Sequence, residues 1–205
     1  MFLIMDLNNL GKICEENSLV LVDSSILSYA PITPTKVEYS KRHKFFYHMD
    51  YSRSMCDFIF NNKNIVTTKE VVGEIKNGLD NYFPSKQRNV CSDYMENHKS
   101  NTFFISQILK RRVLGQHENF GPNLEFIKRF MGTTKISGAD ANFIAHLLTC
   151  SQGGDYTAGL SNDVGLLYVA TKAKKCRNIN SPLSLYYFDG EGFTNAENLE
   201  LIKNI

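Results

Sequence analysis

Near its start the chain reads Leu19-Val20-Leu21-Val22-Asp23-Ser24-Ser25, a continuous apolar run that ends in an acidic residue and two serines. A run without polar alternation is typical of a β-strand buried on both faces, as in a parallel sheet covered by helices. Similar short segments recur at residues 64–67, 157–161 and 183–188, and segments of helical periodicity separate them. The pattern predicts an α/β fold in which strands and helices alternate.

Helices are expected before, between and after these strands. Leu3, Leu7, Leu10 and Cys14 share one face of a helix over residues 2–15, and helical segments are expected around residues 102–114 and 123–131. Thr67 and Glu70 stand at the spacing of a capping box, which predicts a helix with Thr67 as its N-cap.

Length and composition limit the class of protein. A chain of 205 residues fits one domain over residues 1–205, with insertions at residues 31–63 and 80–134, where no strong strand pattern occurs. The net charge of +2 does not by itself indicate a nucleic-acid binder. Five scattered cysteines without a C-x-x-C pair argue against a disulfide framework and favour a reducing cytoplasm. No membrane-spanning segment or signal peptide is expected.

Acidic residues occupy the ends of several predicted elements. Asp23 ends the first strand, Glu74 lies one turn into the helix after the second, Asp140 lies at the start of a later helix, and Asp163 follows another strand. Carboxylates collected from distant segments suit Mg²⁺ or Mn²⁺, which prefer oxygen ligands. Taken singly, each aspartate also fits a turn or helix cap, and Glu74 also fits a solvated helix rim.

Taken in order, these motifs resemble those of the PIN-domain nucleases. The likeness lies in Asp23 with its serines, in the helix glutamate Glu74, in Ser137-x-x-Asp140, and in Ser161-Asn162-Asp163. It covers roughly residues 19–30, 64–79, 136–175 and 183–188. The resemblance implies a PIN-like three-layer α/β/α sandwich around a parallel sheet of about four or five strands, with the acids at the strand ends where ligands bind in open α/β sheets.

The resemblance also implies an activity and roles for these residues. The relatives are metal-dependent ribonucleases, some of them toxins of toxin-antitoxin pairs and others RNA-processing enzymes. Asp23, Asp140 and Asp163 would hold Mg²⁺ or Mn²⁺, and Glu74 would bind a second ion or orient the attacking water. Ser161 and Ser25, which stands where the family often has Asn, would fix the carboxylates by hydrogen bonds.

Two clusters of cations are candidates for contact with RNA. They are Lys110-Arg111-Arg112 and Lys41-Arg42, the second followed by aromatic residues that could stack on bases. Each cluster also fits an ordinary solvated face or a packed insertion. The expected partners are an RNA substrate, unpaired or in loops, and an antitoxin or other protein; a homodimer is possible for this family, and no membrane is expected.

A non-catalytic function remains open beside the nuclease. A PIN-like fold can serve as an RNA-binding or protein-docking module without turnover. Other enzyme classes fit the sequence less well. Haloacid-dehalogenase phosphatases need a second Asp two residues after the first, where this chain has Ser25, and no phosphate-binding glycine motif occurs.

Overall fold

The computed structural model describes residues 8–27, 54–81, 103–115, 117–131, 136–177, 183–189 and 192–199. The predictions for Lys41 and Arg42, for residues 2–7 of the first helix and for most of the insertion at residues 31–63 lie outside these ranges, as does a large part of the insertion at residues 80–134.

A single sheet of five strands forms the centre of the described structure. The strands are β1 (Leu19–Val22), β2 (Ile65–Val66), β3 (Thr157–Leu160), β4 (Leu183–Phe188) and β5 (Phe193–Asn195), in the spatial order β2-β1-β3-β4-β5. The first four run parallel, whereas β5 pairs antiparallel with β4. The predicted α/β class and the parallel central sheet are therefore confirmed.

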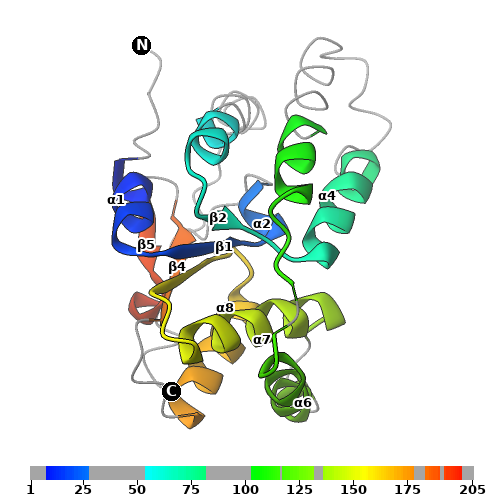
Figure 1. The fold of residues 1–205 in the computed structure, drawn as a ribbon, viewed down its shortest axis with the longest axis vertical. Coiled ribbons are helices and arrows are strands. Elements are labelled where there is room, and N and C mark those ends of the chain that lie inside the picture. Colours follow the sequence, from blue (N-terminus) through cyan, green and yellow to red (C-terminus); the bar gives the residue numbers. More distant parts are fainter. Residues whose placement is uncertain are drawn as a thin grey trace.

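Helices cover both faces of this sheet. They are α1 (Asn8–Glu16), α2 (Ser24–Leu27), α4 (Lys69–Asn81), α6 (Phe120–Met131), α7 (Gly138–Gln152) and α8 (Val164–Cys176), with helical segments at residues 54–61 and 103–110 and a 3-10 turn at Ala196–Asn198. Figure 1 shows α4 and the segments 54–61 and 103–110 on one side of the sheet, and α6, α7 and α8 on the other. This is the predicted three-layer arrangement.

The core lies where the strands meet the helices. Val20, Leu21 and Val22 of β1 are fully buried, as expected for a strand covered on both faces. In the neighbouring β3, Gly159 lets the sheet and α7 approach closely, because a Cβ atom there would lie 2.9 Å from Leu147 Cδ1. The continuous apolar run of β1 therefore encodes its place near the centre of the sheet.

The start of α4 differs from the prediction. Thr68, not Thr67, caps the helix, since its Oγ1 accepts a hydrogen bond from Val71 N at 3.4 Å. Thr67 instead donates to Val22 O at 2.8 Å and so ties the end of β2 to the end of β1. Glu70 accepts a bond from Asn142 Nδ2 at 3.0 Å and does not close a capping box. Hydrogen bonds to residues distant in sequence therefore replace the predicted capping box of Thr67 and Glu70.

The short strand β5 was not predicted, because three residues carry too little periodicity to distinguish a strand from a turn. Among the described residues, no helix is both long and apolar enough to cross a bilayer.

Candidate functional site

Asp23 lies where β1 ends, at the carboxyl edge of the sheet. Its backbone N–H donates to Leu160 O at 3.0 Å, which continues the parallel pairing of β1 with β3 by one residue. Its side chain is 5% exposed. A buried carboxylate needs hydrogen-bond donors or a cation to offset its lost hydration.

Two serines supply donors to Asp23. Ser25 Oγ and, at 2.9 Å, Ser161 Oγ both donate to Asp23 Oδ2, and Ser25 N lies 3.3 Å from the same oxygen. Ser161 comes from the end of β3, 138 residues further along the chain. Both serines therefore make the contacts with a carboxylate that the sequence suggested, and both orient the same oxygen.

The segment after β3 holds Asp163 next to this cluster. Asp163 N donates to Ser161 Oγ at 3.0 Å, and Asn162 N donates to Ser25 Oγ at 2.8 Å. Asp163 is also the N-cap of α8, since its Oδ1 accepts a bond from Leu166 N at 3.0 Å. A Cβ at Gly165 would lie 3.1 Å from that oxygen, so glycine leaves room for the carboxylate.

Asp140 enters from the start of α7. Ser137 Oγ accepts from Asp140 N at 3.1 Å, and Asp140 Oδ2 accepts from Ser137 N at 2.7 Å, which completes a capping box. The Ser-x-x-Asp motif therefore has a structural role at the helix end. It also fixes the position of Asp140 relative to the sheet.

Glu74 approaches from α4, where its side chain lies on the exposed rim. Ser24 Oγ donates to Glu74 Oε2 at 2.6 Å and so links the residue after Asp23 to α4. The sequence motifs gave no role to Ser24. Its position beside Asp23 was the available signal, but its partner lies 50 residues away and is visible only in the fold.

The carboxylates act on one another electrostatically. Desolvation raises the pKa of Glu74 above its usual value, the Ser24 hydrogen bond lowers it, and the charges of Asp23, Asp140 and Glu70 raise it further. Desolvation also raises the pKa of Asp140; the two hydrogen bonds with Ser137 oppose that shift, and the charges of Asp163 and Asp23 add to it. Asp140 therefore feels the charges of Asp23 and Asp163, and Glu74 feels those of Asp23 and Asp140, so the predicted acids lie in one neighbourhood.

Each acid uses one oxygen for these hydrogen bonds and keeps the other. No described residue donates a hydrogen bond to the second oxygens of these acids, which are Asp23 Oδ1, Glu74 Oε1, Asp140 Oδ1 and Asp163 Oδ2. Glu74 and Asp163 are exposed residues, and Asp23 Oδ1 and Asp140 Oδ1 are not among the buried side-chain atoms that lack a partner in the described part of the chain. A cation near this edge would meet oxygen donors that are hard, anionic and already oriented.

The acids lie further apart than side chains that all coordinate a metal ion directly. In the described ranges, no three His, Cys, Asp or Glu side chains stand close enough together to form a metal-binding group. The chemistry of the donors fits Mg²⁺ or Mn²⁺, and the spacing fits an ion that keeps several of its waters and meets some carboxylates through them. Mg²⁺ commonly binds in this way.

The cations predicted to contact RNA fall into two groups. Lys110 and Arg111 are exposed. Arg112, in contrast, donates from Nη1 to Ile59 O and Asn62 O, each at 2.7 Å, and from Nη2 to Phe60 O at 3.3 Å. Its guanidinium therefore closes the end of the helical segment 54–61, which gives Arg112 a structural role that the charge run did not reveal.

A cavity of about 300 Å³ lies elsewhere, lined by His117, Glu118, Asn119, Thr149, Cys150, Gly153 and Asp155. Its α7 residues belong to the end of that helix opposite to Asp140, about 15 Å away at the usual helical rise. Burial raises the pKa of Cys150 to about 11, so its thiol stays protonated and packs as an apolar group. The cavity and the acidic edge are separate features.

Comparison of the chain with models of known protein families, with curated proteins and with solved structures found no match.

Proposed function

We propose that this protein is a divalent-metal-dependent ribonuclease of the PIN type, whose active site is the acidic edge formed by Asp23, Glu74, Asp140 and Asp163. The observation that supports this most strongly is that hydrogen bonds gather carboxylates from separate segments: Ser25 and Ser161 tie Asp23 to the segment of Asp163, and Ser24 ties Glu74 to the segment of Asp23. Like charges repel more strongly as they approach one another, and a divalent cation placed among them relieves that repulsion.

In this proposal Asp23, Asp140 and Asp163 hold the ion, directly or through water. When bound, Mg²⁺ or Mn²⁺ supplies Lewis acidity toward a phosphate oxygen and toward a coordinated water. Ser25 and Ser161 hold the Asp23 carboxylate in one orientation by donating to its Oδ2. The chain thereby keeps the ligand geometry fixed before the substrate arrives.

Glu74 has a different role in the same proposal. It lies on the exposed rim, and its pKa is raised, so it is suited to accept the proton of a water that attacks phosphorus. The water oxygen bonds to phosphorus as the P–O3′ bond breaks, and the departing O3′ takes a proton from solvent, which leaves a 3′-hydroxyl on one product and a 5′-phosphate on the other. Ser24 holds Glu74 in place through Oε2 and leaves Oε1 for the water.

Incubation of the purified protein with an unstructured RNA in Mn²⁺, Mg²⁺ or EDTA tests the activity. We expect cleavage with either metal, none with EDTA, and none in Asp23→Asn or Asp140→Asn. Asparagine is the sharpest replacement at these positions because its amide oxygen can still accept the bonds from Ser161 and Ser137. Loss of activity in a folded variant therefore reports on charge.

A second candidate is a catalytically silent PIN-like module that binds RNA or docks a protein. It is favoured by the spacing of the acids, since the described side chains form no metal-binding group. In the same assay this candidate predicts RNA binding without cleavage in every metal.

A further inference from the structure

The helical segments 54–61 and 103–110 carry three exposed phenylalanines. Phe60 is 58% exposed, Phe103 62% and Phe104 47%, and the rings of Phe60 and Phe104 lie 6.0 Å apart between centroids. Tyr156 is the other large, strongly exposed apolar side chain among the described residues. Exposed aromatic rings that gather on one surface commonly mark an interaction site.

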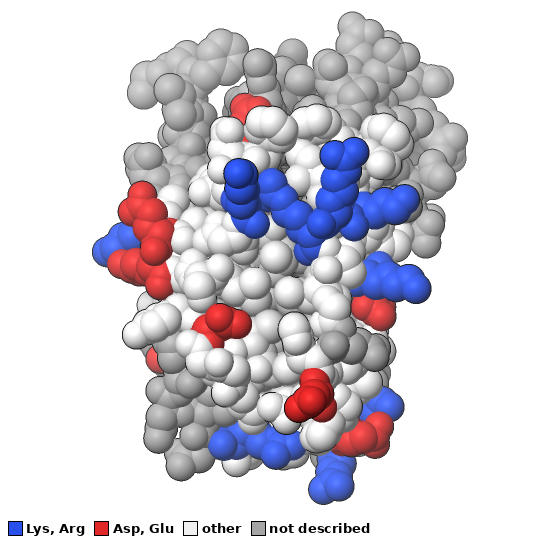
Figure 2. Space-filling model, viewed as in Figure 1, with Lys and Arg blue, Asp and Glu red and all other residues white. Residues whose placement is uncertain are grey.

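Cations lie beside these rings. Residues 54–64 and 103–112 contain Lys63, Lys110, Arg111 and Arg112 against one acid, Asp57. Lys63, Lys110 and Arg111 are exposed, and none of them forms an ion pair within the described ranges. Figure 2 shows Lys and Arg side chains gathered over this part of the molecule, with most acidic groups of that face elsewhere.

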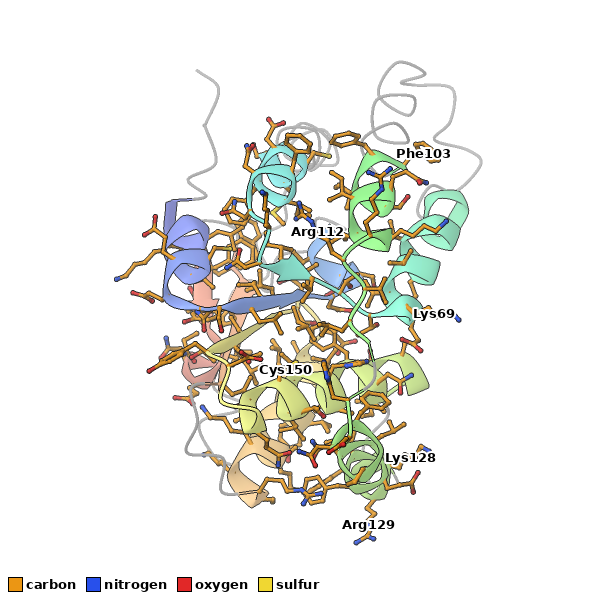
Figure 3. All side chains as sticks on the ribbon, in the orientation of Figure 1. Lys69, Phe103, Arg112, Lys128, Arg129 and Cys150 are labelled. Atoms are coloured by element: carbon orange, nitrogen blue, oxygen red, sulfur yellow. The ribbon has the colours of Figure 1, made fainter. Side chains whose placement is uncertain are left out.

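Arg112 joins the aromatic and the basic residues into one surface. Its bond to Phe60 O and its bonds to Ile59 O and Asn62 O hold the turn after residue 110 against the end of segment 54–61. Lys63 follows that end directly, and Lys110 and Arg111 precede Arg112. Figure 3 places Arg112 and Phe103 in the same upper part of the molecule.

This surface is connected to the acidic edge through the sheet. Thr67 accepts a bond from Leu114 N at 3.0 Å, donates its N–H to Arg112 O at 3.2 Å, and donates its hydroxyl to Val22 O, next to Asp23. Neighbouring strands lie about 4.8 Å apart, so Val113 and Val22 are separated by about 10 Å across Thr67. Val113, two residues after Arg111, therefore pairs with the strand end that lies next to the acidic edge.

We propose that Phe60, Lys63, Phe103, Phe104, Lys110 and Arg111 form a binding surface for single-stranded RNA. Exposed rings stack on unpaired bases and nearby cations contact phosphates, which is the usual combination in single-strand binding. The exposed cations beside the rings make this surface a poorer fit to a purely apolar protein partner. The inference deepens the proposed function, because the RNA held here would be the substrate of the acidic edge.

Fluorescence anisotropy with a labelled 12-nucleotide oligouridylate in EDTA tests this surface without cleavage. Lys110→Gln/Arg111→Gln should weaken binding and make the slope of log K against log salt less negative by about 1.4, because each phosphate contact on a single strand contributes about 0.7. Phe60→Ala/Phe104→Ala should weaken binding at least about five-fold and leave the salt slope unchanged.

Matched controls exist at other sites. Lys128→Gln/Arg129→Gln removes the same charge from α6, whose labelled residues lie at the opposite end of the molecule in Figure 3, and Tyr156→Ala removes an exposed ring that is not among the residues of the proposed surface. Both controls should bind as the unmodified protein does. Equal affinity in test and control variants that melt normally would overturn the proposal, as would a preference for duplex RNA or no RNA binding.

The outcomes separate this inference from the proposed function. RNA binding that depends on these residues, without cleavage in any metal, would support the binding surface and contradict the ribonuclease activity. Cleavage of RNA in the presence of metal, with unchanged RNA affinity in both test variants, would support the ribonuclease activity and contradict the binding surface.

Discussion

Ser24 donates a hydrogen bond of 2.6 Å to Glu74, which joins the first residue of α2 to the helix α4 that begins after the second strand. This bond lowers the pKa of Glu74, against the effects of desolvation and neighbouring acids. It therefore keeps Glu74 more readily ionised than the site would otherwise allow, and an ionised Glu74 can accept a proton and adds negative charge beside the ion.

Ser24→Ala should shift the pH dependence of metal binding. Without the donor, the pKa of Glu74 rises further, so affinity for Mn²⁺ should fall more at the acidic end of the range than at the alkaline end. Calorimetric titrations at several pH values measure this. An affinity lowered equally at every pH would mean that Ser24 acts by packing and not through the ionisation of Glu74.

Ser161→Ala should reduce metal affinity or activity by about 10- to 100-fold, as removal of a residue that orients a ligand commonly does. The reason is that Ser161 Oγ donates to Asp23 and accepts from Asp163 N, so both acids lose a partner. Ser151→Ala is the matched control, since this serine is also buried and its hydroxyl lacks a partner. Equal losses in both variants would contradict the role given to Ser161.

His146 should make the protein less stable in mild acid. It is buried against Phe120, with ring centroids 4.3 Å apart, and desolvation lowers its pKa, opposed by Glu70 and assisted by His117. A lowered histidine pKa contributes stability that is present above the unfolded value of 6.5 and is lost as the pH falls through the folded value.

Chemical unfolding between pH 7.5 and 5 checks this prediction. One titrating group changes the free energy of unfolding by at most about 1.4 kcal/mol per pH unit. His146→Phe should therefore make the free energy of unfolding depend less on pH. The exposed His117 serves for comparison, and His117→Gln should change the slope much less. A His146→Phe protein with an unaltered slope would assign the acid sensitivity to other groups.

Gly159→Ala should destabilise the protein by about 1–3 kcal/mol, because the added methyl group would press on Leu147 and Leu185 between α7 and the sheet. Gly11→Ala is the matched change in an open position of α1, where nothing lies within 4 Å of the new Cβ. That variant should gain about 0.5–1 kcal/mol from helix propensity. Thermal unfolding of the two variants should move the melting temperature in opposite directions.

Local patterns in the sequence were enough to predict the fold class and the positions of the acids. The continuous apolar run of β1 predicted a strand that is buried on both faces. The apolar segments at residues 64–67, 157–161 and 183–188 predicted strands for the same reason. Asp140 and Asp163 do cap helices, so their structural and candidate functional roles coexist in the same side chains.

Tertiary partners could not be predicted in the same way. Thr67 and Glu70 match a capping box in sequence, but Val22 and Asn142 compete for their side chains once the chain folds. Arg112 looks like its neighbours in a charge run, yet it donates hydrogen bonds to carbonyl oxygens at the end of segment 54–61. Such outcomes depend on segments that are distant in sequence, which local periodicity does not report.

Calorimetric titration of Mn²⁺ into the unmodified protein and into Asp23→Asn, Asp140→Asn and Asp163→Asn tests most directly whether these acids act together. We expect binding to the unmodified protein and a marked loss of affinity in each variant, because all three asparagines retain the hydrogen bonds that support the fold and lack only the charge. Folded variants that bind Mn²⁺ as well as the unmodified protein, or an unmodified protein that binds none at millimolar Mn²⁺, would contradict this expectation.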